Sequence, residues 1–166
     1  MAMPVRIREF AMSDYNEVRG LWKKSGLEIR PGDDAEGIRA KLEKDPDLFL
    51  VAEEGGKIVG SVMGAWDGRR GWLYHLGVLP GHRRRGIATK LVREVEKRMR
   101  RKGVVKVNAL IYETNRPSLA FFLIMGYTAD RSTVFHGKKL RAQPKGISLH
   151  KHPWRKRKSI ASRALT

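Results

Sequence analysis

The stretch between residues 72 and 102 constrains the fold of this chain more than any other. Residues 72–79 are predicted to form a buried strand before a proline, and a short basic loop then leads into a helix over 86–102. The helix prediction rests on apolar residues that recur at the spacing of one helical face, namely Ile87, Leu91, Val92, Val95 and Met99. Gly103 follows as a typical C-terminal cap. Such a unit favours an α/β arrangement, in which the helix packs on a sheet.

The remaining patterns extend this unit into a full domain. Alternating or short apolar runs between turn signals predict strands at 5–10, 47–54, 57–66 and 104–111, and one or two more within 127–140. Apolar residues at helical spacing predict helices at 13–26, 35–44 and 116–125. The order is then β-α-α-β-β-β-α-β-α-β, which indicates an α/β (α+β) fold with a mixed sheet.

Length and composition limit the class of protein. A chain of 166 residues fits one domain with a hydrophobic core, which we place at 1–141, and we expect 142–166 to be a flexible or loosely docked basic tail. The chain has no cysteine, so disulfides, thiolate nucleophiles and cysteine-based metal sites are excluded. No apolar run reaches the roughly 18 residues of a membrane span, and the N-terminus lacks the apolar core of a signal peptide. We therefore expect a cytoplasmic protein.

The charge of the chain is strongly positive. Its net charge is +18, and a field of that sign attracts nucleic acid, acidic membrane surfaces or a phosphorylated cofactor. Residues 142–166 carry seven Lys or Arg and no acid, including a basic run at 155–158. The sequence thus leaves open nucleic acid or another polyanion as a partner of the tail. A homodimer is left open as well.

The loop before the 86–102 helix has the chemistry of an anion site. The first N–H groups of a helix lack internal partners, and the helix dipole adds partial positive charge at that end. Gly86 and the small Ala88 would let a phosphate approach the backbone, and the arginines at 83–85 add full charges. The competing interpretation is a solvated basic turn. Neither a GxxxxGK[ST] nor a GxGxxG motif is present to decide between them.

Two motifs give this loop a context. Arg83-x-x-Gly86-x-Ala88, after the strand with Tyr74-His75-Leu76-Gly77-Val78, resembles the acetyl-CoA signature of the GNAT N-acetyltransferase superfamily. Residues 115–127 resemble that family's Asn-x-x-Ala-x-x-Phe-Tyr-x-x-x-Gly-Phe segment. The resemblance covers about residues 4–140. Within the family, the sequence is most similar to small prokaryotic YpeA-like members. It implies a mixed, mostly antiparallel sheet flanked by helices and splayed open at its central strands.

The resemblance also assigns roles to residues. It implies that backbone groups of Leu76, Gly77 and Val78 hold the pantetheine arm of acetyl-CoA, with the Val78 N–H donating to the thioester oxygen as negative charge develops there. It implies that the pyrophosphate is surrounded, mainly by backbone N–H groups, by Arg84, Arg85, Gly86, Ile87, Ala88 and Thr89. Arg83 matches the first position of the motif and is counted among the cofactor-binding residues. Asn115 either bonds to the pantetheine arm or orders the gap; the other interpretation is that it only caps the next helix.

Phe122 departs from the family pattern, which has a tyrosine there to protonate the leaving thiolate. We still place it among the cofactor-binding residues. Either solvent or another hydroxyl then supplies the proton, or the thiolate leaves unassisted. A thiol with a pKa near ~8.5 is a fair leaving group, so this loss costs little. On the central strand, Tyr74 is expected to face the acceptor and hold a water, whereas His75, with the better pKa for a base, has the opposite parity. Tyr112 and Tyr127 are expected to be structural. Glu53, Glu54, Asp67 and Glu113 stay open as alternative bases.

The sequence therefore predicts an acetyl-CoA-dependent N-acetyltransferase that moves an acetyl group to a primary amine of a small molecule or a protein by direct attack on the thioester. Metal is not required. The alternatives are a nucleic-acid-binding module that uses the basic tail and a non-catalytic acyl-CoA-binding protein. The acceptor pocket is expected around residues 20–45 and the last strands.

Overall fold

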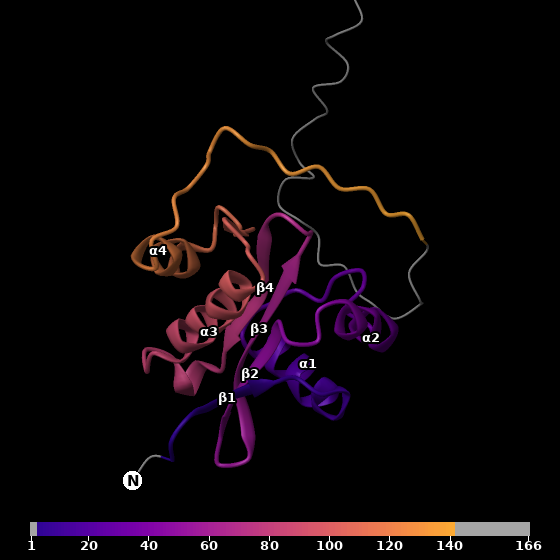
Figure 1. Ribbon diagram of the computed structural model, residues 1–166. Coiled ribbons are helices and arrows are strands. Elements are labelled where there is room, and N and C mark those ends of the chain that lie inside the picture. Colours follow the sequence, from indigo (N-terminus) through magenta and orange to yellow (C-terminus); the bar gives the residue numbers. More distant parts are fainter. Residues whose placement is uncertain (1–2, 142–166) are drawn as a thin grey trace, which may run out of the picture.

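The computed structural model describes residues 3–141. The elements are β1 (Arg6–Glu9), α1 (Tyr15–Lys24), α2 (Ala35–Lys44), β2 (Phe49–Glu54), β3 (Lys57–Trp66), β4 (Gly71–Val78), α3 (Ile87–Arg101), β5 (Val107–Ala109) and α4 (Arg116–Ile124), with 3₁₀ turns at Met12–Asp14 and Pro80–His82. One sheet holds the strands in the order β1-β2-β3-β4-β5 (Figure 1). Successive strands from β1 to β4 are antiparallel, and β4 and β5 are parallel. The predicted mixed, mostly antiparallel sheet is confirmed.

Helix α3 packs its apolar stripe against one face of this sheet (Figure 1). The buried side chains are those of the predicted stripe, Ile87, Leu91, Val92, Val95 and Met99. Helix and sheet approach so closely that a Cβ at Gly64 of β3 would lie 2.8 Å from Val95 Cγ1. Gly103 ends the helical path with a φ of +82°. The predicted helix over 86–102 is confirmed to within one residue at each end.

Helices α1 and α2 cover the opposite face (Figure 1). Val18, Leu21 and Trp22 of α1 are almost fully buried, and they form one apolar cluster with Ile38 of α2 and Phe49 of β2. The sheet thus has an apolar layer on each side, which fixes its position between the helices. The end of β4, between these two layers, is where the candidate site forms.

The strand or strands predicted within 127–140 are wrong. None of the residues 128–140 is in a strand, and the chain there runs across the outside of the molecule (Figure 1). Its apolar side chains Val134, Phe135 and Leu140 are 69–89% exposed. The neighbouring edge strand β5 is only three residues long, so it offers a short edge for a further strand to pair with.

The predicted tail at 142–166 lies outside the described residues, so the domain boundary at 141 stays a prediction. Within residues 3–141, no helix is long and apolar enough to cross a membrane.

Candidate active site

Strands β4 and β5 are paired over only part of their length, which opens a gap in the sheet. The pairing runs from Gly71 opposite Val107 to Leu73 opposite Ala109. β4 continues to Val78, but no described residue of β5 pairs with it beyond Leu73. The splayed sheet that the resemblance implies is therefore present. Residues 74–78 border the gap.

The peptide groups of Val78 point into this gap. Leu79 N–H donates to the Val59 carbonyl at 2.9 Å across the β3–β4 pair. Bonded and non-bonded positions alternate along an antiparallel pair, so the N–H and carbonyl of Val78 face away from β3. The Val78 carbonyl accepts from Arg83 Nε at 3.2 Å, which agrees with this direction. Its N–H is therefore oriented as an oxyanion donor at the gap would be.

Gly77 and Leu76 fit the same wall of the gap. A Cβ at Gly77 would lie 2.9 Å from Leu27 Cδ1, so glycine is required for the close approach of β4 to the end of α1. The Leu76 side chain packs against the core on the α3 side. Its side chain thus serves the core, which leaves the backbone as the part that could bind a ligand.

The N-terminus of α3 is open toward solvent. The first bond within the helix runs from Lys90 N–H to the Gly86 carbonyl at 3.0 Å, so the N–H groups of Ile87, Ala88 and Thr89 have no intrahelical acceptor. Gly86 has a φ of +76° and no side chain to cap them. A left-handed residue beside a helical one turns successive N–H groups toward one side, which forms a concavity that binds anions.

The arginines of the loop have three different surroundings. Arg83 donates to the carbonyls of Val78 and Ser25, each at 3.2 Å, and so ties the loop to β4 and to the end of α1. Arg85 binds Glu54 with both Nη atoms, at 2.5 and 3.0 Å. The charge and hydrogen bonds of Arg85 hold the pKa of Glu54 below its ordinary value.

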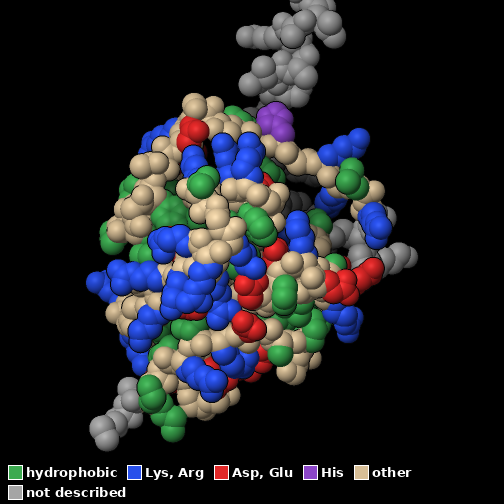
Figure 2. All heavy atoms as spheres, in the orientation of Figure 1, with side chains coloured by type: hydrophobic (Ala, Val, Ile, Leu, Met, Phe, Trp, Pro, Cys, Tyr) green, Lys and Arg blue, Asp and Glu red, His purple; other side chains and the backbone are tan. Residues whose placement is uncertain are grey.

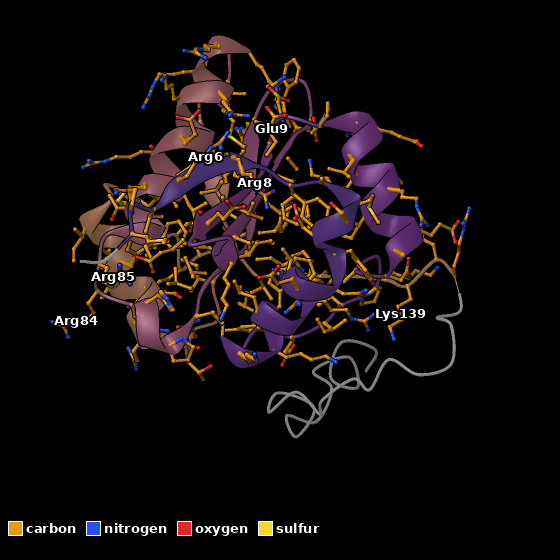
Figure 3. The ribbon with its side chains drawn as sticks, turned by 90° about the horizontal axis from the view of Figure 1, so that it is seen from below. Arg6, Arg8, Glu9, Arg84, Arg85 and Lys139 are labelled. Carbon is orange, nitrogen blue, oxygen red and sulfur yellow. The ribbon has the colours of Figure 1, made fainter. Side chains whose placement is uncertain are left out.

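Arg84 differs from its two neighbours. It has a left-handed φ of +60°, and it points outward from the molecule (Figure 3). Among the described residues it has no hydrogen-bond or ion-pair partner. It is therefore the arginine of this loop whose charge is available to a ligand.

Tyr74 and His75 lie on the same face of β4, although they are adjacent in sequence. Between Tyr74 and Gly77, β4 carries one residue more than the paired stretch of β3, which is a bulge. His75 has a left-handed φ of +47° there, and its ring lies 4.4 Å from that of Trp22 in α1. Tyr74 faces the same side through its pairing with Met63, a member of the α1–α2 cluster. The prediction that His75 points to the other face is wrong, because the bulge resets the alternation.

His75 is held by a set of buried partners. Its Nε2 lies 2.8 Å from Oδ1 of Asp33, a residue only 6% exposed. The other carboxylate oxygen of Asp33 accepts from the Arg30 N–H at 2.6 Å. Trp22, which covers the imidazole, donates from Nε1 to Ser61 Oγ at 3.0 Å. Sequence reasoning missed Asp33, since it lies 42 positions from His75 and no motif connects the two.

Tyr74 is partly accessible, with 37% of its surface exposed. Partial burial, and then the charge of Asp67, raises the pKa of its hydroxyl above the ordinary value. Tyr74 therefore stays protonated at neutral pH. Its protonated hydroxyl can hold a water, as predicted, but it cannot accept the proton of an amine.

The segment from Asn115 to Tyr127 packs on the α3 side of the sheet. Asn115 Oδ1 accepts from the Ser118 N–H at 3.2 Å, so its role as the N-cap of α4 is confirmed; a contact to the cofactor stays a prediction. Phe122 is 5% exposed and packs edge-on against Tyr127. The Tyr127 hydroxyl donates to Glu96 of α3 at 2.6 Å. That hydroxyl is thus part of the helix packing, in agreement with the structural role predicted for it.

A groove of about 720 Å³ lies between the start of α2 and the last described residues. It is lined by residues of 31–40 and 137–141, and Gly32 and Asp34 on its wall flank Asp33. The sequence predicts an acceptor pocket around residues 20–45 and the last strands. Residues of both stretches line this groove, but 137–141 form no strand. Within residues 3–141, no group of three or more His, Asp or Glu side chains could hold a metal ion.

Comparison with known proteins decides the family. Residues 7–127 match the family described as Acetyltransferase (GNAT) family. The chain belongs to this family. An acetyltransferase of Sodalis glossinidius is 42% identical over 82% of this GNAT chain and 96% of its own length. One of Pectobacterium atrosepticum is 44% identical over the same shares. Membership makes the chain an N-acetyltransferase, whereas its likeness to YpeA-like members stays a prediction.

Solved structures of other acetyltransferases share the fold. The PaiA N-acetyltransferase of Thermoplasma acidophilum, in complex with coenzyme A, has a TM-score of 0.71 at 18% identity over 77% of this chain and 92% of that one. The aminoglycoside acetyltransferase AAC(6')-Iy, in complex with a bisubstrate analogue, has a TM-score of 0.64 at 21% identity over 82% and 99%. At these identities the likeness concerns the fold of this GNAT chain alone.

Proposed function

We propose that this protein transfers the acetyl group of acetyl-CoA to a primary amine, and that the amine attacks the thioester directly. The observation that carries the proposal is the open N-terminus of α3 beside the unpaired edge of β4. Unpaired helix N–H groups and an unpartnered Arg84 suit the phosphates of the cofactor. A strand edge whose peptide groups face a gap suits the amides of the pantetheine arm. The residues present therefore fit acetyl-CoA.

The proposed cofactor contacts follow from these directions. The N–H groups from Ile87 to Thr89 bind the pyrophosphate, and Arg84 adds a full positive charge. The backbone of 76–78 binds the pantetheine arm, and the Val78 N–H stabilises the charge that develops on the thioester oxygen. Asn115 has amide hydrogens left for the arm, because its cap to α4 uses only the oxygen.

Two side chains of the loop have a supporting role in this proposal. Arg83 and Arg85 are engaged with backbone carbonyls and with Glu54, so they hold the loop in shape and offer mainly their backbone to the phosphates. Phe122 is buried in the core on the α3 side, and its proposed contribution to the cofactor site is an apolar wall.

Acetyl-CoA supplies the activated acyl group when bound. An alkyl amine has a pKa near ~10.4 and must lose a proton before its nitrogen can form the new bond to carbon. The carbon–sulfur bond then breaks, and the sulfur leaves as a thiolate with the electron pair. Phe122 has no proton to give, and a thiolate of pKa near ~8.5 needs none. Tyr74 holds a water on the acceptor side.

The charge of the chain bears on the acceptor. A net charge of +18 repels free polyamines and favours acidic or phosphorylated amines. The groove along α2 carries Lys138, Lys139 and Arg141 on its wall, which would attract such a molecule. Several proteins of the same fold are aminoglycoside acetyltransferases, so aminoglycosides belong in a first screen.

The test is a turnover screen with acetyl-CoA and amino acids, peptides, polyamines and aminoglycosides, read by the appearance of free thiol. We expect amine-dependent thiol release, and acetylation of acidic acceptors in preference to polyamines. Absence of acetyl-CoA binding up to millimolar concentration by calorimetry would contradict the proposal. Binding without turnover of any amine would favour the non-catalytic alternative.

A second candidate function is binding to nucleic acid through the predicted tail, in a cytoplasmic setting. Lys and Arg side chains also gather over the side of the molecule that carries α3 (Figure 2). Replacing residues 155–158 by glutamine should reduce retention on DNA and leave acetyl-CoA affinity unchanged. Undiminished retention would contradict a role for the tail. Gel filtration with light scattering would show whether the protein forms a homodimer, which the sequence leaves open.

A further inference from the structure

His75 has a backbone conformation that a side-chain-bearing residue rarely adopts. Its φ of +47° lies in the left-handed region, which outside glycine is populated mainly by asparagine and aspartate. Such a conformation is strained and persists only where the surroundings enforce it, and such residues cluster at functional sites. Here it turns the imidazole onto the α1–α2 face within the segment that borders the gap.

The hydrogen bond to Asp33 fixes which ring nitrogen carries the hydrogen. With a neutral imidazole and an ionised carboxylate, Nε2 donates to Asp33 Oδ1 and Nδ1 keeps its lone pair. Nδ1 has no hydrogen-bond partner among the described residues, and the His75 side chain is 12% exposed. Asp33 is in turn held by the Arg30 N–H, and Trp22 covers the ring. The imidazole thus has a fixed orientation, a buried negative partner and an open acceptor atom.

A carboxylate behind an imidazole has a known physical effect. It holds the ring in one tautomer and stabilises the positive charge that appears when the open nitrogen takes up a proton. Asp33 Oδ1 lies 2.8 Å from the ring, and the indole of Trp22 packs against it. The groove beside α2 is lined by Gly32 and Asp34, the two sequence neighbours of Asp33.

We propose that His75, oriented by Asp33, is the general base that takes the proton from the acceptor amine. The inference rests on the proposed function, since it names the base for that reaction. The acceptor arrives as an ammonium ion, and one of its N–H protons moves to Nδ1. The freed lone pair forms the nitrogen–carbon bond, the carbon–sulfur bond breaks with its electron pair going to sulfur, and a second N–H proton passes from the acylated nitrogen to the thiolate or to solvent. The imidazolium then returns its proton to solvent. Tyr74, on the same face, holds the water through which that proton leaves.

The first test needs no acceptor. Diethyl pyrocarbonate labels neutral imidazoles, and mass spectrometry reports which histidine carries the label. We expect His75 to be labelled in the free protein and protected by acetyl-CoA, whereas the exposed His136 is labelled in both states. A His75 that is unreactive throughout, or that stays equally reactive with acetyl-CoA bound, would overturn the inference while the proposed function stands. If acetyl-CoA does not bind at all, the proposed function fails first.

The second test separates a base from a structural residue. His75→Gln keeps an N–H donor for Asp33 but cannot take a proton at neutral pH, and His136→Gln is the matched control. With benzylamine, which is protonated at neutral pH, we expect His75→Gln to lose about 10²–10⁴-fold in rate. With hydroxylamine, which is already neutral, the loss should be smaller, below roughly 10²-fold, which is the low end of that range. Equal losses for both amines, with unchanged acetyl-CoA affinity, would contradict the inference. The labelling result decides where neither probe is a substrate.

Discussion

The N-termini of α3 and α4 meet the same physical need in opposite ways. Both helices begin with N–H groups that have no internal acceptor. At α4, Asn115 caps Ser118 and a proline occupies the first turn, so that end is completed by its own residues. At α3, Gly86 offers no side chain, and the preceding Arg84 has no partner among residues 3–141. One end is closed and the other is open to an anion.

The difference shows how to tell a binding end of a helix from a structural one. The α2 N-terminus is also closed, by Asp34 accepting from Gly37. Helices usually complete their ends with such a cap, since a Ser, Thr, Asp or Asn cap contributes about 1 kcal/mol. A long helix that omits the cap beside a gap in the sheet leaves that energy to a ligand. Substitutions can place a negative charge at the open N-terminus of α3 or remove the cap from the closed N-terminus of α4.

Closing the α3 end should have the largest effect. Gly86→Asp places a carboxylate where the pyrophosphate is proposed to bind, and we expect acetyl-CoA affinity to fall about 100-fold, or roughly 2.7 kcal/mol, in calorimetry. Gly86→Asn imposes the same left-handed conformation without the charge, and should lose much less. Asn115→Asp places the same carboxylate at α4 and should leave the affinity unchanged. Equal effects of the two Gly86 variants would show that backbone strain, not charge, matters there.

Reversing the free charge beside the open end should have the next largest effect. Arg84→Glu is expected to weaken acetyl-CoA binding by about 10-fold, which corresponds to about 1.4 kcal/mol, with little change in melting temperature. Arg101→Glu makes the same change of net charge at the opposite end of α3. If both variants lose affinity equally, the overall field of the protein, rather than the loop, attracts the cofactor.

Disturbing the closed end should cost stability rather than affinity. Asn115→Ala removes the cap of α4 and should lower the free energy of unfolding by about 1 kcal/mol, as measured by urea denaturation. We expect acetyl-CoA affinity to fall less than in Arg84→Glu. A larger fall would mean that the contact of Asn115 with the cofactor outweighs its role as a cap.

The smallest effect concerns pH. Arg85 lowers the pKa of Glu54 in the folded state, so this pair stabilises the protein above the unfolded pKa of glutamate, near ~4.3, and its contribution is lost as the pH falls through the lowered folded value. Glu54→Gln should therefore be slightly less stable than the wild type at pH 7, and this difference should shrink as the pH falls from neutral to pH 3. Asn115→Ala should show the same difference at both pH values, because an amide cap does not titrate in this range. A Glu54→Gln difference that is undiminished at pH 3 would contradict the ion-pair account.

Local sequence patterns predicted the open end of the helix well. The α3 stripe has a strict helical period and a glycine at each end, so its bounds could be predicted within one residue. The same is true of β3, whose predicted range is the observed one. These elements are decided by neighbouring residues and by one buried face.

What the sequence did not predict depends on contacts between distant residues. The bulge at His75 arises from the pairing of β3 with β4, and its partner Asp33 comes from the loop before α2. Similarly, Arg83 and Arg85 look equivalent to Arg84 in the sequence, but Ser25 and Glu54 engage them. The prediction of a final strand was wrong because an apolar pattern is local, whereas a strand also needs a partner, and the edge strand β5 is only three residues long.

The most direct test of the open helix end compares two ligands that differ in their phosphates. Wild-type protein, Arg84→Glu and Gly86→Asp would each be titrated by calorimetry with acetyl-CoA and with S-acetylpantetheine, which lacks every phosphate. We expect both variants to lose affinity for acetyl-CoA and to keep the wild-type affinity for S-acetylpantetheine. Equal losses for the two ligands would contradict the assignment of the α3 N-terminus as the phosphate site.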